Sequence, residues 1–343
     1  MDLLKRLSEA PGVPGYEARV RDVMTEALEG LVDELQTDRL GNLLARVHGP
    51  APSVVVAAHM DEIGFLVSFV AEKTGFLHIE PLGGFDPRTL VAQRVVVHTQ
   101  QGELPGVIGS KPPHILTEEE RKKPLQLKDL FVDVGLPAQD VRDRAQVGDM
   151  VTLQQEFKTF GNVVSGKALD DRAGVYAAIE AVRRVGSPAC DLTLVGTTQE
   201  EVGLRGARVA GFAAHPDIAI ALDATIAVDL PRVQEHEQVT RLGSGVAIKL
   251  KDSSSISHPA LVRHMRALAE ERDIPYQMEI LPRGGTDAGA LQFAHEGAAV
   301  ITLSLPVRYV HSVVETAHVD DLEALIALLA AFMETADKVD LSR

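Results

Sequence analysis

The 343-residue chain contains one cysteine, Cys190, and little that suits a membrane. One cysteine excludes an intrachain disulfide and cysteine-based zinc fingers, and it fits a reducing compartment. The longest apolar stretch near the C-terminus, 322–332, is interrupted by Glu323 and is too short to cross a bilayer. The first ten residues carry charges where a secretory signal would be apolar. We therefore expect a cytoplasmic protein.

Positive charge is also scarce. The chain has 34 Lys and Arg against 49 Asp and Glu, a formal net charge of −15. Such an acidic protein is a poor candidate for binding nucleic acid or an anionic membrane, so neither is an expected partner. The surplus carboxylates suit either a solvated surface or a cluster of divalent cations. A content of 45% hydrophobic and 24% charged residues is typical of a globular protein.

Strand-like and helix-like patterns alternate in two separate parts of the chain. Apolar runs predict strands at 53–59, 192–197, 217–222, 276–281 and 299–305. Helical spacing predicts helices at 174–185, 259–271, 288–295 and 319–339, the last with His318 and Asp320 as capping candidates. This alternation predicts an α/β fold with a mostly parallel sheet covered on both faces. Between the two parts, residues 72–161 hold 7 of the 18 prolines and short runs separated by turns, which indicates a β-rich module.

Polar residues follow the predicted strands at the edge where open α/β sheets carry their chemistry. They are His59, the pair Glu200–Glu201, Asp223 and His311, while Asp170–Asp171 precede a helix. Two imidazoles and several carboxylates suit a pair of zinc, cobalt or manganese ions. One of the adjacent glutamates can bind metal while the other handles protons. The spacing of His59 and Asp61 predicts that the Asp61 carboxylate orients the imidazole, provided that the strand continues.

Each of these groups has a structural alternative. A single histidine at a strand end is more often structural, and two aspartates before a helix often cap it. Only the combination favours a metal site. The segment 161–167 begins like a phosphate-binding loop, but Ala168 replaces the required hydroxyl, so nucleotide hydrolysis is rejected.

Six motifs in fixed order carry a resemblance to a known family. They are AHMDEIG (58–64), ALDDR (168–172), QEEVG (199–203), LDA (222–224), RGGTDAG (283–289) and RYVHS (308–312). Together they resemble the dinuclear metallo-aminopeptidases of the TET and glutamyl aminopeptidase family, some of which are called endoglucanases. The similarity runs over nearly the whole chain.

The resemblance implies an architecture and a role for each site residue. The fold would be a three-layer α/β catalytic domain with a mostly parallel mixed sheet, built from residues 1–67 and 162–343. An inserted β-rich dimerisation domain would occupy 68–161. His59 and Asp223 would bind one ion, Glu201 and His311 the other, and Asp170 both. Glu200 would be the general base. Asp61 and Asp171 would lie behind the ligands. A cis peptide bond would join Asp170 to Asp171. The substrate pocket would be bordered by Arg283, Gly284, Gly285, Thr286 and Asp287.

The implied activity is removal of N-terminal residues from short peptides by a water that two divalent metal ions activate. Zn²⁺ is the first choice of metal, with Co²⁺ or Mn²⁺ as alternatives. The implied assembly is a tetrahedral dodecamer built from dimers. The motifs do not set the preferred N-terminal residue.

Other activities use similar residues. A metal-dependent carboxypeptidase or N-acyl amino acid deacylase would need Arg283 or Arg308 to face the metals. A glycoside hydrolase would use Glu200 and Glu201 as its carboxylate pair, but adjacent residues of a strand point to opposite faces. A non-catalytic scaffold would have no use for a spare glutamate beside a complete ligand set.

Overall fold

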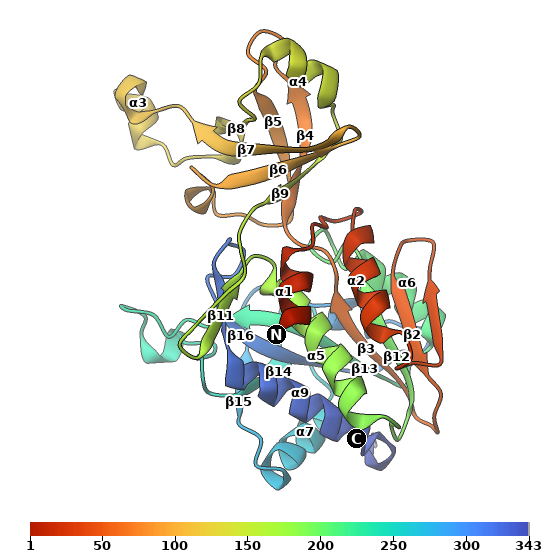
Figure 1. The fold of residues 1–343 in the computed structure, drawn as a ribbon. Helices are drawn as coiled ribbons and strands as arrows, with labels where there is room; N and C mark the ends of the chain where they lie inside the picture. The colour runs from red at the N-terminus through yellow and green to blue at the C-terminus, as the bar shows by residue number, and fades with distance from the viewer. Residues whose placement is uncertain (342–343) are drawn as a thin grey trace.

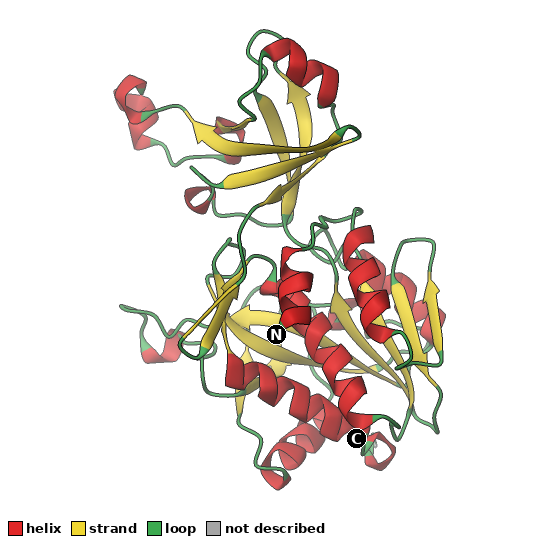
Figure 2. Ribbon diagram, viewed as in Figure 1, coloured by secondary structure: helices red, strands yellow, loops and turns green. Residues whose placement is uncertain are grey.

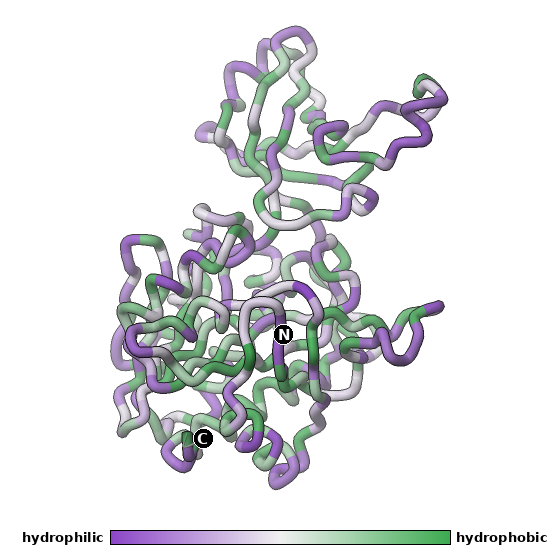
Figure 3. The backbone as a smooth tube through the Cα atoms, turned by 180° about the vertical axis from the view of Figure 1, so that it is seen from behind, coloured by the Kyte–Doolittle hydropathy of each residue, from purple (hydrophilic) through white to green (hydrophobic). Residues whose placement is uncertain are grey.

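The computed structural model describes residues 1–341 and has two regions (Figures 1 and 2). One is a large sheet with helices packed on it, and the other is a small closed barrel. Hydrophobic stretches gather toward the inside of the larger region, and hydrophilic stretches lie mostly in the outer loops (Figure 3). None of the described helices is long and apolar enough to cross a membrane.

The large sheet has eleven strands in the order β1-β2-β12-β3-β13-β16-β17-β11-β10, with β14 beside β16 and β15 beside β14. Its centre is parallel and consists of β12 (Asp191–Thr197), β3 (Ser53–His59), β13 (Ile218–Ile226) and β16 (Ala299–Arg308). The other strands are β1 (Glu34–Thr37), β2 (Leu43–Val47), β10 (Lys158–Phe160), β11 (Val163–Gly166), β14 (Val246–Lys251), β15 (Tyr276–Ile280) and β17 (Glu315–His318). Apart from the parallel pair β14–β15, these strands pair antiparallel, so the sheet is mixed.

Helices cover both faces of this sheet, as the alternation predicts. One face carries α1 (Asp2–Glu9), α2 (Ala18–Leu28), α5 (Leu169–Val185), α7 (Pro259–Glu271) and α9 (Val319–Met333), and the other carries α6 (Arg205–Ala214) and α8 (Ala288–Leu291). The residues of β3 explain why both faces are covered. Val54 and Val56 belong to the core under α5 and α9. Val55 and Ala57 point the other way and belong to the core under α6 and α8. Side chains on a strand alternate between its faces, so an uninterrupted apolar strand is buried on both.

The barrel is closed in the order β4-β5-β8-β7-β6-β9 and confirms the predicted β-rich segment. Its strands are β4 (Gly64–Val70), β5 (Leu77–Leu82), β6 (Arg94–Thr99), β7 (Gly102–Ser110), β8 (Leu130–Asp133) and β9 (Met150–Leu153). Phe65, Leu77 and Val97 belong to a core of its own. Helix α4 (Ala138–Arg144) lies on the barrel, and α3 (Glu118–Lys122) lies on an arm that points away from it (Figure 1). Short 3₁₀ turns are η1 (Pro87–Thr89), η2 (Pro113–Ile115), η3 (Leu127–Asp129), η4 (Glu235–Glu237) and η5 (Ala336–Lys338).

Several element ends differ from the prediction: α5 begins at Leu169 rather than residue 174, β16 runs to Arg308 rather than 305, and three further ends have a clear cause. The helix predicted at 288–295 ends at Leu291, because Phe293 and Ala294 donate to carbonyls only three residues back. The helix predicted at 319–339 ends at Met333, and the hydroxyl of Thr335 bonds the carbonyl of Ala331. Strand β13 runs past Leu222 to residue 226, because β16 offers it a longer partner. The capping role of His318 is confirmed: its Nδ1 accepts the backbone N–H of Asp320 at 3.2 Å.

Candidate metal centre and substrate pocket

The predicted ligands converge on one pocket at the carboxyl edge of the parallel strands. His59 is the last residue of β3, Glu201 follows β12, and His311 follows β16. Asp223 lies within β13 rather than at its end, and Asp170 lies at the start of α5. All five line a cavity of about 440 Å³ together with Glu200. The sequence therefore identified which side chains meet, although they are separated by up to 252 positions (311 − 59).

The carboxylate of Asp170 lies between the two histidines. Its Oδ1 is 3.2 Å from His59 Nε2, and its Oδ2 is 3.5 Å from His311 Nε2. Glu201 Oε1 is 3.1 Å from the same His311 nitrogen. Ligand atoms of His59, Asp170 and Glu201 lie within 4.8 Å of one another. A carboxylate whose two oxygens face two different imidazoles has the arrangement that a bridge between two cations requires.

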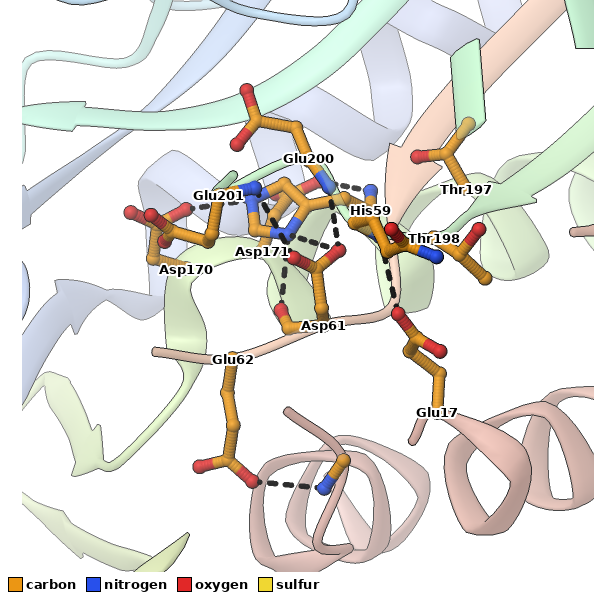
Figure 4. A network of polar contacts seen from close by, with 12 residues as sticks. Glu17, His59, Asp61, Glu62, Asp170, Asp171, Thr197, Thr198, Glu200 and Glu201 are labelled. Carbon is orange, nitrogen blue, oxygen red and sulfur yellow. Dashed lines mark hydrogen bonds and ion pairs between the residues drawn. The ribbon is translucent and has the colours of Figure 1, made fainter. Parts of the chain in front are cut away.

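Glu200 and Glu201 are adjacent but point in different directions (Figure 4). Glu201 points toward Asp170, whereas no hydrogen bond or ion pair involves the Glu200 carboxylate within residues 1–341. The Asp61 carboxylate fixes this turn by accepting the backbone N–H of Glu200 at 3.0 Å and that of Glu201 at 3.1 Å. Two neighbouring carboxylates thus have separate surroundings.

Asp61 supports the site differently from the prediction. The ring Nδ1 of His59 lies 3.0 Å from the backbone carbonyl of Asp61, and its distance to the Asp61 carboxylate is 3.7 Å. The reason is that β3 ends at His59, so the expected strand alternation does not continue to residue 61. The carbonyl oxygen sets the ring orientation, and the carboxylate is free to hold the turn at 200–201.

Two further carboxylates hold the backbone behind the ligands. Asp171, after a cis peptide bond as predicted, accepts the backbone N–H of His59 at 3.2 Å. Glu315 accepts the backbone N–H of Asp170 at 3.0 Å and that of His311 at 2.8 Å. The sequence analysis missed Glu315, since a lone glutamate at the start of a strand carries no recognisable signal. A single side chain thus fixes both the central aspartate and one of the histidines.

The electrostatics of the cluster favour added positive charge. Burial raises the pKa of Glu200 well above its usual value, and burial together with the charge of Asp170 does the same to Asp223. Burial acts to lower the pKa of His59, but its hydrogen bond with Asp170 and the surrounding carboxylates outweigh this and raise that pKa. Imidazole and carboxylate donors are those that zinc, cobalt and manganese prefer. The residues present therefore fit divalent cations, whose charge would keep the buried carboxylates ionised.

The segment 283–287 is only partly at the pocket. Arg283, Gly284 and Gly285 line it. Thr286 and Asp287 are buried behind it instead: Thr286 Oγ1 lies 2.9 Å from the Thr302 hydroxyl, and Asp287 Oδ2 accepts the Thr197 hydroxyl at 2.5 Å. The prediction that these two residues border the pocket is wrong, because they join α8 to the adjoining strands.

Arg308, the other candidate for carboxylate recognition, is occupied. Its Nε and NH2 donate to the two oxygens of Asp229 at 2.8 and 2.6 Å. Lys167, the end of the rejected phosphate-loop motif, is buried and lies 2.6 Å from both oxygens of Glu62. Both side chains therefore brace the structure.

The barrel also touches the site. A Cβ added to Gly83, in the loop after β5, would lie 3.2 Å from Glu201 Oε2, and a Cβ added to Gly84 would lie 3.5 Å from His311 Nδ1. Gly83 also has a φ of +92°, which favours glycine. An added Cβ would clash with Ile63 at position 83, where it would lie 2.5 Å from Cγ2, whereas position 84 has room for a methyl group at ordinary contact distance.

Comparisons with known proteins agree on one family. Residues 41–328 match the M42 glutamyl aminopeptidase family, and residues 1–24 match a family described as AMPT. The chain is 38% identical to the lysyl aminopeptidase of Pyrococcus furiosus over 345 residues, 99% of this chain and 98% of the relative. These matches span almost the whole protein.

Solved structures give the same result. The TET aminopeptidase of a marine sediment Thaumarchaeota archaeon superposes with a TM-score of 0.95 at 35% identity, covering 97% of this chain and 95% of that one. The TET1 peptidase of Pyrococcus horikoshii, which can assemble into a tetrahedron or a large octahedral shell, gives 0.86 at 33% identity with 97% and 98% coverage. An endoglucanase from Thermotoga maritima gives 0.81 at 33% identity with 99% coverage of both chains.

Proposed function

The chain belongs to the M42 glutamyl aminopeptidase family, and from this premise we propose how its pocket removes N-terminal residues from short peptides. Aminopeptidase activity follows from the family. The observation that supports the mechanism is the position of Asp170 between His59 and His311, with Glu201 on the second histidine and Glu200 left free.

Two divalent cations would be held by five side chains. His59 and Asp223 would bind one, Glu201 and His311 the other, and the two oxygens of Asp170 would serve both. Zn²⁺ suits this set first, with Co²⁺ and Mn²⁺ as alternatives. When bound, such a pair would lower the pKa of a shared water and polarise the peptide carbonyl. Asp61, Asp171 and Glu315 would hold the ligands in place through the backbone.

Glu200 would be the general base. It lines the pocket and has no partner within the described chain that would compete for a proton. It would take a proton from the attacking water and deliver it to the leaving amine. The free α-amine of the substrate would lie against the carboxylates of the pocket, and this contact would restrict cleavage to the peptide N-terminus.

The rival activities have less support. A glycoside hydrolase needs two available carboxylates across one glycosidic bond, but Glu201 contacts His311 and points away from Glu200. A carboxypeptidase or deacylase would use a guanidinium near the metals; Asp229 occupies Arg308, but Arg283 lines the pocket, so it is the family match that favours an aminopeptidase over this rival. The name of the Thermotoga maritima structure still makes a cellulosic substrate the proper control.

A substrate panel tests the proposal. Amino-acid p-nitroanilides, an N-acylated amino acid, a peptide with a blocked N-terminus and carboxymethyl cellulose would be offered to protein loaded with each metal. We expect hydrolysis of the anilides with a free amine only. Cleavage of the blocked peptide or of cellulose, with the anilides untouched, would refute the proposal.

We also propose a division into domains. Residues 1–67 and 162–343 would form a three-layer catalytic domain, and 68–161 an inserted dimerisation domain. Because β4 pairs only with barrel strands, the first boundary would be better set before Gly64. The barrel contributes none of the proposed metal ligands. Its proposed role is therefore contact with another subunit of the same protein.

Self-association beyond a dimer is the remaining part of the proposal. The TET1 relative forms closed shells, which require more than one kind of contact between subunits. Phe212, Phe293 and Ile256, at 71%, 77% and 74% exposure, offer apolar surface outside the barrel's own residues. We expect a dodecamer that admits unfolded peptides and excludes folded proteins. Light scattering tests this assembly, and a monomer at micromolar concentration with metal present would refute it.

A further inference from the structure

The turn that carries Glu200 is held through its backbone. It lies between the end of β12 at Thr197 and the start of α6 at Arg205. Four consecutive N–H groups of this turn donate to side chains from distant parts of the chain. Those of Thr198, Gln199, Glu200 and Glu201 bond to Asn42, Glu17, Asp61 and again Asp61, at 2.9, 3.1, 3.0 and 3.1 Å. The three acceptor side chains are at most 3% exposed, so three buried residues determine where the turn lies.

The two carboxylates among these acceptors hold different parts of the turn. Asp61 bonds both Glu200 and the proposed ligand Glu201, so its loss would disturb the general base and a metal ion together. Glu17 bonds only the residue before Glu200 (Figure 4). Among the described residues, the Glu17 carboxylate makes no hydrogen bond or ion pair with a proposed metal ligand. The contact of Glu17 can therefore be removed with the metal ligands left in place.

The position of Glu17 in the fold argues against a purely local role. Glu17 is the N-cap residue of α2, but its side chain does not cap that helix. A polar side chain at an N-cap usually accepts a backbone N–H from the first helical turn. The Oε1 of Glu17 instead accepts the N–H of Gly15 at 2.7 Å and that of Gln199 at 3.1 Å. The second of these bonds spans 182 positions of the chain and reaches the turn at 198–201.

The direction of the Glu200 side chain depends on the backbone that carries it. No hydrogen bond or ion pair holds its carboxylate within residues 1–341. The preceding residue, Gln199, has a φ of +57°, in the left-handed region that residues other than glycine rarely adopt. A change in the backbone of Gln199 would therefore turn the Glu200 carboxylate relative to the pocket, with no side-chain contact to resist it.

We propose that Glu17 is a positioning residue for Glu200: its hydrogen bond to the Gln199 backbone sets the direction of the general base. The inference rests on the proposed function, which makes Glu200 that base. The segment that carries Glu17 is itself anchored, because the hydroxyl of Tyr16 donates to the carbonyl of Gly148 in the barrel at 3.1 Å. A fixed segment can hold the turn in one position.

Three substitutions of Glu17 separate its hydrogen bond from its charge. Glu17→Met removes the acceptor and keeps the length of the side chain. We expect kcat to fall about tenfold or more, the scale for a misplaced reacting group, with KM and metal content unchanged. Glu17→Gln keeps a carbonyl oxygen as acceptor and should restore most of the lost kcat. Glu17→Asp keeps the charge but shortens the reach. It should lower kcat by a smaller factor, and it replaces Glu17→Met if that variant does not fold.

The matched control is Glu9→Met. The Oε1 of Glu9 accepts the backbone N–H of Phe157 at 3.0 Å, a contact of the same kind across 148 positions but outside the turn. This variant should keep its kcat whatever happens to its thermal stability. A double variant tests the route of the effect. Because Glu17 is proposed to act only through Glu200, adding Glu17→Met to Glu200→Gln should cause no further loss of kcat.

The outcomes separate this inference from the proposed function. If Glu200→Gln keeps full kcat, the proposed base and this inference both fail. If Glu200→Gln is impaired, three results overturn the role of Glu17 alone. The first is full kcat in Glu17→Met, and the second is the same fractional loss from Glu17→Met with and without Glu200→Gln. The third is a fall in metal content or a rise in KM that accounts for the lost activity. A Glu17→Gln variant as impaired as Glu17→Met would also overturn it, since the hydrogen bond would then not be what matters.

Discussion

The barrel and the large sheet are both built on apolar strands, yet they differ in what they bury. In residues 64–153 the buried charged side chains consist of Asp149 alone. The large sheet and its loops bury many more, including Glu62, Lys167, Asp170 and Arg172. The barrel buries mainly apolar side chains, whereas buried charges need partners. In the large sheet some partners are other side chains, as Lys167 is for Glu62, and the proposed cations would partner the carboxylates around Asp170.

Metal removal should give the largest difference between the two regions. We expect a chelator to abolish peptide hydrolysis, and Zn²⁺, Co²⁺ or Mn²⁺ to restore it. Amide hydrogen exchange should rise around 59–62, 168–172, 199–204 and 309–315 and stay unchanged in the barrel, because cations stabilise only the state that binds them. Full activity in a preparation that elemental analysis shows to be metal-free would contradict this.

The ligand set can be divided further by substitution. Asp170→Asn should weaken binding of both ions, because its two oxygens face different histidines, whereas His59→Ala should affect mainly one. Metal content per chain measures the difference. Loss of a single ion in each of the two variants would rule out the bridge.

The next effect in size concerns the adjacent glutamates. We expect Glu200→Gln to keep its metal and to lose at least ~10²-fold in kcat, the low end for a general base. Glu201→Gln should lose metal instead, because its carboxylate contacts His311. If metal content falls in the first variant and holds in the second, the two roles are exchanged.

Substitution of Glu315 should also weaken metal binding, but by less than substitution of a ligand. Glu315→Gln replaces one acceptor of the backbone N–H groups of Asp170 and His311 with a donor. We expect metal affinity to fall ~10- to 100-fold, the usual cost of losing a group that orients metal ligands. Calorimetric titration of Zn²⁺ measures it, and the surface variant Glu323→Gln is the control. Unchanged affinity would make Glu315 a structural residue only.

A substitution in the barrel core should lower the stability of the protein and leave its metal content and turnover unchanged, the opposite of a substitution among the proposed ligands. Leu77→Ala removes a fully buried side chain and should cost ~2–5 kcal/mol of stability. Turnover per folded chain should change little, because Leu77 contacts none of the proposed ligands. Thermal unfolding and metal content measure the two properties. A loss of metal with unchanged stability would show that the regions are not separable in this way.

The smallest expected effect is acid sensitivity within the barrel. Burial lowers the pKa of His98 below its usual value of 6.5, so the unfolded chain binds a proton more readily than the folded one. This contribution to stability is present above the unfolded pKa and is lost as the pH falls below it. His98→Gln should therefore show a smaller fall in its thermal midpoint on acidification than the wild type. An equal fall would exclude His98 as the cause.

Patterns that depend on one segment were readable in the sequence. Strand β3, helix α7 and the cap at His318 follow from apolar runs and from local hydrogen-bonding groups. The membership of the site was also predictable, because polar residues at parallel strand ends must meet at one edge. The sequence does not indicate which atom of a residue makes a contact. Asp61 orients His59 with its backbone, which no residue-type pattern distinguishes from its carboxylate.

Features that depend on distant segments were missed for a related reason. Glu315, Gly83 and Asp287 derive their roles from residues far away in the chain, such as Asp170 for Glu315. Asp287 sits in a motif that predicts a place at the pocket, but its buried carboxylate accepts the hydroxyl of Thr197 instead. The ends of some helices and strands differ from the prediction because a neighbouring element determines them. Strand β13, for example, extends as far as its pairing with β16 continues.

The approach of Gly83 and Gly84 to Glu201 and His311 limits how the barrel can be exchanged. A barrel transplanted from a relative would need the right fold and the right closure, and it would also need a glycine at position 83, beside Glu201. Even an alanine at position 83 would place its methyl 2.5 Å from Ile63 Cγ2. Chimaeras designed to alter subunit assembly should therefore retain the loop after β5 from the recipient, because Gly83 and Gly84 lie against two of the proposed ligands although the chain reaches them through the barrel.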